Sequence, residues 1–147
     1  MQNEMEIRFL SLSPNEGFAR AVASAFAAQM NPGLEELSDI RTAVSEAVTN
    51  AIIHGYEQRT DRYVSMRVII DGDELTIIVR DDGCGIGDVE LARKPFYTSK
   101  PELERSGMGF SVMEAFMDTV TVESTLGSGT TVTMRKRIRH ANGSDCV

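Results

Sequence analysis

The segment YVSMRVIIDGDELTIIVRDDGCGIG, residues 63–87, contains two apolar runs and ends in a stretch with three glycines among five residues. Residues 63–70 and 74–80 have the β-branched, largely apolar composition of buried strands. The Asp71-Gly72 pair between them is a strong hairpin signal, because a two-residue turn of this kind matches the twist of the paired strands. The segment therefore predicts two antiparallel strands followed by a loop.

The loop over residues 81–87 is longer than a tight turn needs, and the chain continues from it into a short helical stretch at 89–94. Glycines at 83, 85 and 87 permit positive φ and let a ligand approach backbone N–H groups. This spacing alone is compatible with a purely structural loop as well as with a binding loop.

Upstream of the hairpin, the pattern predicts one strand and two helices. Residues 5–12 alternate as a half-buried strand, and Ser13 is expected to cap a helix that has Pro14 in its first turn and ends before residues 31–33. The residues of this helix expected to be buried are Phe18, Ala21, Val22, Ala25 and Phe26. A longer helix is predicted from Leu34 to His54, with Gly55 as its stop and with Leu37, Ile40, Ala43, Val44, Ala47, Val48 and Ala51 buried.

Downstream of the loop, residues 94–106 read as a polar, mobile lid, a helix opens at Gly109, and two strands follow at 118–125 and 129–138. With no internal repeat or linker, residues 1–138 are expected to form one domain, followed by a disordered tail at 139–147. The fold class is α+β: two layers, with a mainly antiparallel mixed sheet and helices on one face.

Composition excludes several function classes. The 147 residues carry a net charge of -7, which opposes nucleic-acid binding. No apolar run approaches the roughly 20 residues of a membrane span, and the first ten residues lack the pattern of a secretory leader, so we expect a cytoplasmic protein. The two cysteines, Cys84 and Cys146, are expected to be free thiols.

The long helix carries a polar row within an otherwise apolar sequence. Glu46, Asn50 and His54 are spaced i, i+4 and i+8 and therefore share a face. This row is either a solvated stripe or a site where hard oxygens hold a divalent cation and the carboxylate accepts a proton. His54 lies beside Gly55, which favours a helix C-cap partner over a ligand.

A second polar segment, ERSGMGF at 104–110, opens the next helix. Unpaired N–H groups and the positive end of the helix dipole make a glycine-rich helix start a site for phosphate, and Arg105 can meet terminal phosphate charge. The alternative is a glycine-rich helix entry with a solvated arginine.

Four segments in order resemble one superfamily. EAVTNAIIHG at 46–55, DDGCGIG at 81–87, SGMGF at 106–110 and GSGTTV at 127–132 are similar to the N box and the G boxes of the Bergerat-fold ATPases, which include gyrase, histidine kinases and the heat-shock chaperone. The resemblance covers roughly residues 5–138 and implies a Bergerat-type α/β sandwich that binds ATP and Mg²⁺.

The resemblance also implies roles for single residues. Glu46 is the expected catalytic base, Asn50 the Mg²⁺ ligand and Asp81 the acceptor for the adenine amino group, in a pocket shaped by Gly83 and Gly85. Arg105 would approach the γ-phosphate. The expected phosphate contacts are Ser106, Gly107, Met108 and Gly109, Thr130 would lie near adenine, and Cys84 is given no role.

Within the superfamily, the short chain and the wording VSEAVTNAIIHGY and KPELERSGMGF resemble the anti-sigma factors of sporulation. That implies an ATP-dependent serine protein kinase that inhibits a sigma factor and phosphorylates its anti-anti-sigma antagonist. No histidine precedes Glu46, so the acceptor is expected on another protein. The alternatives are a nucleotide-gated sigma-binding module without catalysis and a related stress-response switch kinase.

The first helix is the expected partner surface. Its polar face, with Glu16 and Arg20, is either simply solvated or, as in the resembled family, a partner contact, and Arg20 is the residue chosen for that role. A homodimer through the amino-terminal strand and helix is implied by the same resemblance.

Overall fold

The computed structural model describes residues 1–93 and 109–139, in which five strands form one sheet in the order β1-β2-β3-β5-β4. The strands are β1 (Gln2–Leu10), β2 (Tyr63–Asp71), β3 (Glu74–Asp81), β4 (Thr119–Thr125) and β5 (Gly129–Arg137). The helical segments are α1 (Pro14–Ala27), η1 (Ala28–Met30), α2 (Leu34–Asn50), η2 (Ala51–Gly55), α3 (Val89–Ala92) and α4 (Gly109–Phe116).

Every strand pair among the described residues is antiparallel. A hairpin joins β2 to β3 as predicted, but its two turn residues are Gly72, at φ +63°, and Asp73, because Asp71 still belongs to β2 and pairs with Glu74. The expectation of a mixed sheet is wrong on one point. β1, β3 and β4 run in one direction and β2 and β5 in the other, and the strand order makes every pair of neighbours antiparallel.

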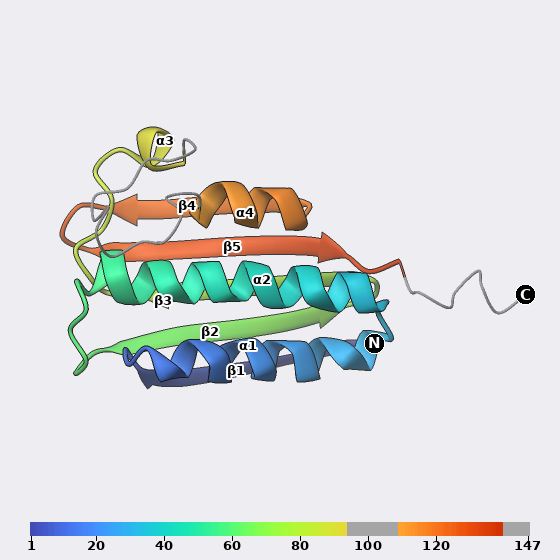
Figure 1. The fold of residues 1–147 in the computed structure, drawn as a ribbon. Coiled ribbons are helices and arrows are strands. Elements are labelled where there is room, and N and C mark those ends of the chain that lie inside the picture. Colours follow the sequence, from blue (N-terminus) through green and yellow to red (C-terminus); the bar gives the residue numbers. More distant parts are fainter. Residues whose placement is uncertain (94–108, 140–147) are drawn as a thin grey trace, which may run out of the picture.

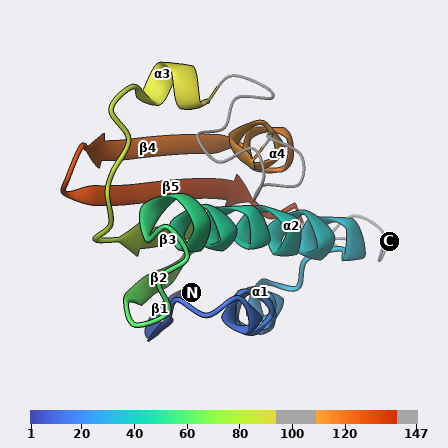
Figure 2. The ribbon, with the colours of Figure 1, turned by 60° about the vertical axis from the view of Figure 1, so that its left-hand side comes forward.

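The helices α1, α2 and α4 lie side by side on one face of the sheet, and α3 lies beyond β4 (Figures 1 and 2). This is the two-layer α+β arrangement that the sequence predicts. Within residues 1–93 and 109–139, no helix is both long and apolar enough to cross a membrane.

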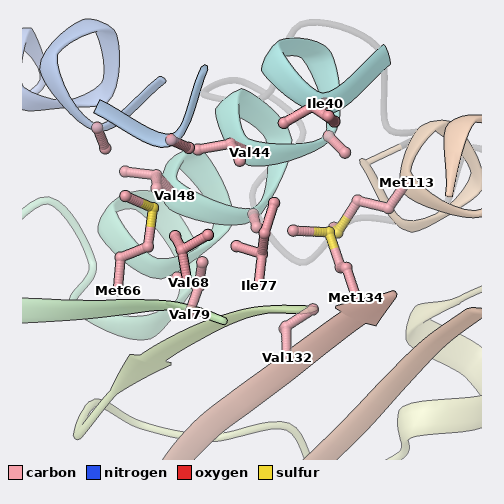
Figure 3. Close-up of a cluster of buried hydrophobic side chains, with 14 of the residues drawn as sticks. Ile40, Val44, Val48, Met66, Val68, Ile77, Val79, Met113, Val132 and Met134 are labelled. Atoms are coloured by element: carbon pink, nitrogen blue, oxygen red, sulfur yellow. The ribbon is translucent and has the colours of Figure 1, made fainter. Parts of the chain in front are cut away.

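The core forms where α2 crosses the middle of the sheet. Ile40, Val44 and Val48 of α2 point toward the strands and meet β2, β3 and β5 side chains, while Met113 of α4 meets Met134 (Figure 3). Burying side chains of this size contributes about 1.5–3 kcal/mol each. The predicted apolar stripe of α2 is confirmed, with Leu37 only partly buried.

The predicted buried face of α1 is wrong. The residues buried in α1 are Ala19, Ala23 and Ala27, whereas Phe18 is 54% exposed and Val22 and Phe26 are half-buried. A row of alanines lets the helix axis approach its neighbours closely, so Val22 and Phe26 pack only at the margin of the core, while the predicted Ala21 and Ala25 are exposed.

The start of α1 also differs from expectation. Ser13 occupies the position before the helix, but its backbone is already helical and its side chain makes no capping hydrogen bond. Asn15 holds this corner instead, because its side-chain amide donates to the Leu10 carbonyl at 2.8 Å. Side-chain capping is found at α2, where the Glu36 carboxylate accepts from the Gly33 N–H at 2.9 Å, and at α3, where the Asp88 carboxylate accepts from the Leu91 N–H at 3.0 Å.

Candidate functional site

The polar segments singled out in the sequence meet at one end of the molecule. The C-terminal end of α2, the end of β3 and the starts of α4 and β5 all lie toward the left-hand side of Figure 1. Asp81 of β3 pairs with Thr130 of β5 and contacts Gly55, while Gly109 of α4 contacts the side chain of Asn50. The structure therefore brings together predicted site residues that are up to 80 positions apart in the chain.

The end of α2 is not a regular α-helix. After Asn50 the chain continues as the π-helical turn η2, in which the Tyr56 N–H donates to the Ala51 carbonyl at 3.0 Å. A π-turn inserts an extra residue into the helix, so the i, i+4 row of Glu46 and Asn50 does not continue regularly to His54. The His54 carbonyl instead accepts a hydrogen bond from the thiol of Cys84 at 2.9 Å.

Asp81 is a buried carboxylate in contact with this turn. It is 5% exposed, and a Cβ placed on Gly55 would lie 2.5 Å from its Oδ1 atom. The Gly83 N–H donates to Oδ1 at 2.9 Å. Burial raises the pKa of Asp81 to about 6, the Asp82 charge adds to the rise, and the backbone hydrogen bonds from Gly83 and Thr130 oppose it. The site thus contains a buried carboxylate that can accept hydrogen bonds and whose negative charge the backbone donors stabilise only in part.

The predicted glycines of the loop after β3 are required by packing. A Cβ on Gly83 would lie 1.9 Å from the Gly55 carbonyl oxygen, and one on Gly85, which has φ +75°, would lie 2.1 Å from the Thr125 carbonyl oxygen. The loop is thus pressed between η2 and the β4–β5 turn, where only glycine fits. Gly87 has no comparable constraint.

Cys84 lies on the same loop, is exposed and carries its sulfur as a thiol. Its backbone N–H donates to the Gly55 carbonyl at 2.8 Å, and its carbonyl accepts from the Gly127 N–H at 2.6 Å. The position therefore joins η2 to the β4–β5 turn through main-chain atoms, which any residue type other than proline can supply.

Ser124 and Tyr56 are two polar residues of this site that the sequence reasoning missed. The Ser124 Oγ accepts from the Ile86 N–H at 2.7 Å and lies 2.8 Å from the hydroxyl of the buried Thr130. The Tyr56 hydroxyl accepts from the Asp82 N–H at 2.7 Å. The sequence did contain an indication for Ser124. This residue lies in β4 two residues after Val122 and four residues after Val120, whose side chains face inward, so the alternation of the strand places Ser124 on the same face. Tyr56 gave no signal beyond following Gly55.

Glu46 lies one helical turn before Asn50, at a groove of about 400 Å³ between α1 and α2. The same groove is lined by Arg20, and Glu16 joins the two helices there. The Glu16 carboxylate accepts from the Ser45 hydroxyl at 2.8 Å and pairs with Arg20 at 3.4 Å. Glu16 and Arg20 are thus not simply solvated. The structure brings the predicted partner residue and the predicted catalytic base to one groove.

Asn50 is the predicted metal ligand, and its surroundings fit that role. A Cβ on Gly109 would lie 3.0 and 3.1 Å from the side-chain nitrogen and oxygen of Asn50, so this amide lies against the N-terminus of α4. Within residues 1–93 and 109–139, no cluster of three or more His, Cys, Asp or Glu side chains could hold a metal ion. Mg²⁺ is commonly bound by one or two carboxylates together with waters and substrate phosphates, and Asn50 offers a single amide oxygen to such a site.

The other predicted phosphate contacts, Arg105, Ser106, Gly107 and Met108, lie outside the described residues, as do the predicted lid at 94–106 and Cys146.

Comparisons with known proteins agree with this geometry. Residues 15–136 match the family model described as a histidine kinase-like ATPase domain. An anti-sigma F factor of Clostridium perfringens is 57% identical over 138 residues, which is 94% of this chain and 99% of that protein. An anti-sigma F factor of Geobacillus kaustophilus is 55% identical over 138 residues, with 94% of each chain covered.

A solved structure has the same fold at low sequence identity. The RsbU and RsbW domains of Rv1364c from Mycobacterium tuberculosis superpose with a TM-score of 0.67 at 20% identity, covering 92% of this chain and 32% of that chain.

Proposed function

Because the chain belongs to the histidine kinase-like ATPase domain family and, within it, to the anti-sigma F factors, we propose that it is an ATP-dependent serine protein kinase that also binds and inhibits a sigma factor. One observation carries the nucleotide-dependent part of this proposal. The buried carboxylate of Asp81 lies at the same end of the molecule as Asn50, Gly109 and Thr130, which the fold draws together from four separate segments.

Asp81 supports selection of adenine. A buried carboxylate satisfies an exocyclic amino group, which donates, but leaves a carbonyl at the same place unpaired, and an unpaired buried polar group costs about 1–3 kcal/mol. Adenine presents the amino group and guanine the carbonyl at this position of the ring. Thr130 is adjacent to Asp81 across the β3–β5 ladder, so its hydroxyl is the second polar group offered to the base.

Asn50 and the N-terminus of α4 support binding of the phosphates. Gly109 leaves the Asn50 amide in contact with the helix start, where backbone N–H groups and the helix dipole favour negative charge. Mg²⁺, when bound, neutralises charge on the phosphate oxygens, and Asn50 is the described residue that would hold it. Arg105, Ser106, Gly107 and Met108 remain proposed phosphate contacts on the strength of the sequence motif.

Glu46 is the proposed base of phosphoryl transfer. The serine hydroxyl of the acceptor protein attacks the γ-phosphorus, its proton passes to the Glu46 carboxylate, and the bond from that phosphorus to the bridging oxygen breaks to release ADP. Glu46 lies one turn from Asn50 on α2 and at the groove between α1 and α2, so an acceptor segment in this groove reaches both the base and the phosphate side of the site.

The groove is also the proposed partner surface. Arg20 lines it and is fixed by Glu16, which itself is held by Ser45 of α2. We assign the sigma factor and the anti-anti-sigma substrate to this side of the molecule, with Arg20 as a contact. A sigma factor partner and the acidic charge of the chain both fit a protein of the cytoplasm that acts on transcription without touching DNA.

The proposed assembly is a homodimer of the single ATP-binding domain, residues 1–138. β1 is an edge strand of the sheet, and Phe18 on α1 is 54% exposed. An unpaired strand edge beside exposed apolar side chains is a surface on which a second copy can pack.

The Glu46→Gln variant tests the catalytic assignment. With γ-labelled ATP, Mg²⁺ and the anti-anti-sigma protein, it should transfer at least about a hundredfold less label than the unmodified chain, since a positioned base contributes about 10²–10⁴-fold. Its ATP affinity should remain within about twofold, because Glu46 is assigned no ground-state contact with ATP. Glu123→Gln, an exposed glutamate of β4, is the matched control and should transfer normally.

Unchanged transfer by Glu46→Gln would remove Glu46 from the mechanism. If the unmodified chain labels no partner but still forms an ATP-dependent complex with the sigma factor, the protein is a nucleotide-gated binding module and not a kinase.

A further inference from the structure

Tyr56 lies between the two strands that lead into the site. Its hydroxyl donates to the Tyr63 carbonyl at 2.6 Å and accepts from the Asp82 N–H at 2.7 Å. The side chain is 6% exposed, so the ring is buried while the hydroxyl uses one donor and one acceptor position. Tyr63 begins β2, and Asp82 directly follows the end of β3.

The two groups that the hydroxyl joins would otherwise pair with each other. The last register pair of β2 and β3 at this end is Ser65 with Arg80. Continued by two residues on each strand, the same register places Tyr63 opposite Asp82. The hydroxyl of Tyr56 is therefore inserted where the antiparallel ladder would have closed, and it satisfies a carbonyl and an N–H that would be left unpaired as the strands separate.

The separation of the strands coincides with the burial of Asp81. Asp81 precedes Asp82, and its carboxylate lies where a side chain on Gly55 would stand. Gly55 in turn directly precedes Tyr56. The same short loop is held to the η2 turn a second time, because the Cys84 N–H donates to the Gly55 carbonyl at 2.8 Å.

We propose that Tyr56 is a positioning residue for base recognition: its hydroxyl keeps β3 apart from β2 after Arg80 and so holds Asp81 at Gly55 in the orientation that selects adenine. This inference rests on the proposed function for its ligand. The geometry that it assigns to Tyr56 concerns the protein without nucleotide and is testable there.

The Tyr56→Phe variant removes the hydroxyl and keeps the buried ring. Tyr63→Phe is the matched control, because Tyr63 takes part through its backbone carbonyl and its own side chain is 48% exposed. Two measurements on the full chain are needed. They are the affinities for ATP and GTP, and amide hydrogen exchange of Asp82, Gly83 and Cys84 without nucleotide.

For Tyr56→Phe we expect an ATP affinity about tenfold lower, equivalent to about 1.4 kcal/mol, with little change for GTP. The ratio of the two affinities should therefore fall. Exchange should accelerate at Gly83 and Cys84 as well as at Asp82, because the whole loop loses its anchor. Tyr63→Phe should leave both readouts unchanged. A purely structural role would lower the free energy of unfolding but would leave the ATP-to-GTP ratio as it was.

The inference is overturned if Tyr56→Phe keeps the ATP-to-GTP ratio, or if only the Asp82 amide exchanges faster. A different result, in which the unmodified chain does not prefer ATP over GTP, would contradict the adenine role proposed for Asp81. In that case, amide exchange at Gly83 and Cys84 that is slow in the unmodified chain and faster in Tyr56→Phe would still establish that the Tyr56 hydroxyl positions the loop.

Discussion

The carboxylate of Asp81 occupies the space in which a side chain at Gly55 would stand: a Cβ on Gly55 would lie 2.5 Å from Oδ1 and 2.8 Å from Oδ2 of Asp81. Gly55 ends the π-turn after α2, and Asp81 ends β3. Because Gly55 has no side chain, the Asp81 carboxylate can be buried against it.

Gly55→Ala should displace Asp81 and reduce ATP affinity by at least about tenfold, or about 1.4 kcal/mol. Overpacking of this kind lowers the free energy of unfolding by about 1–3 kcal/mol. Calorimetric titration with ATP and urea denaturation measure the two effects. Gly17→Ala is the control, because the nearest atom to its new Cβ is a flexible Arg20 nitrogen at 3.6 Å. An unchanged ATP affinity in Gly55→Ala would show that the position of Asp81 does not matter for binding.

Asp81→Asn should stabilise the nucleotide-free protein at pH 8 by about 1–3 kcal/mol while weakening ATP binding. Burial raises the pKa of Asp81 to about 6, above its value of about 3.9 in the unfolded chain, so ionising it opposes folding. Protonated Asp81 contributes to the stability of the folded protein. This contribution is complete below pH 3.9 and is lost as the pH rises through 6.

The gain in Asp81→Asn should therefore be small at pH 4, where Asp81 is protonated in the folded protein and about half protonated in the unfolded chain. Urea denaturation at pH 4 and pH 8 measures this difference. Asp82→Asn, which changes the exposed neighbouring carboxylate, serves as the control and should show no comparable gain. A loss of stability in Asp81→Asn at pH 8 would mean that the carboxylate is compensated in the folded protein.

Affinity for adenine nucleotides should depend on pH with a midpoint near the raised pKa of Asp81, about 6. Above that pH the ionised carboxylate is the stronger acceptor for the adenine amino group, and below it the affinity should decline. Titration with ADP between pH 5 and pH 8 measures the profile. Asp82→Asn should keep a pH-dependent affinity but move the midpoint to a lower pH, because the Asp82 charge adds to the raised pKa of Asp81. An affinity that is flat across the range in the unmodified chain would show that Asp81 does not bind the base.

Arg20→Ala should weaken sigma factor binding without changing ATP affinity. Arg20 lines the groove between α1 and α2 and is held by Glu16, on a different part of the molecule from Asp81. Loss of a charged contact at an interface typically costs about 2–5 kcal/mol when it is buried there. Titration of the sigma factor in the presence of ATP gives the affinity.

Arg67→Ala is the matched control for Arg20→Ala, since Arg67 also pairs with a glutamate, Glu4 at 2.8 Å, but on the strand face away from the helices. Equal losses of sigma factor affinity in the two variants would point to a nonspecific charge effect, and no loss in Arg20→Ala would move the partner surface elsewhere.

Local patterns predicted the elements well. The hairpin between β2 and β3 and the apolar stripe of α2 are confirmed, because turn chemistry and periodicity act within a few residues. The predicted buried face of α1 was wrong because the large apolar side chains were expected to be the buried ones. In the structure the small Ala19, Ala23 and Ala27 allow close packing, and the large Phe18 remains outside.

The residues of the proposed nucleotide site were assigned as a set from the order of their motifs, but the burial and the contacts of each residue could not be predicted in this way. The burial of Asp81 requires Gly55, Gly83 and Thr130 to meet around it from three segments. Tyr56 and Ser124 support the same loop through side-chain contacts that no local pattern announces.

Neighbouring residues were enough to predict which segments form strands and helices and in which order the polar motifs follow one another. The buried face of α1, the burial and raised pKa of Asp81, and the groove shared by Arg20 and Glu46 became visible only in the folded chain. These properties arise from packing between segments far apart in the chain, where the exclusion of water and the contacts of each side chain are set by partners that its own neighbours do not specify.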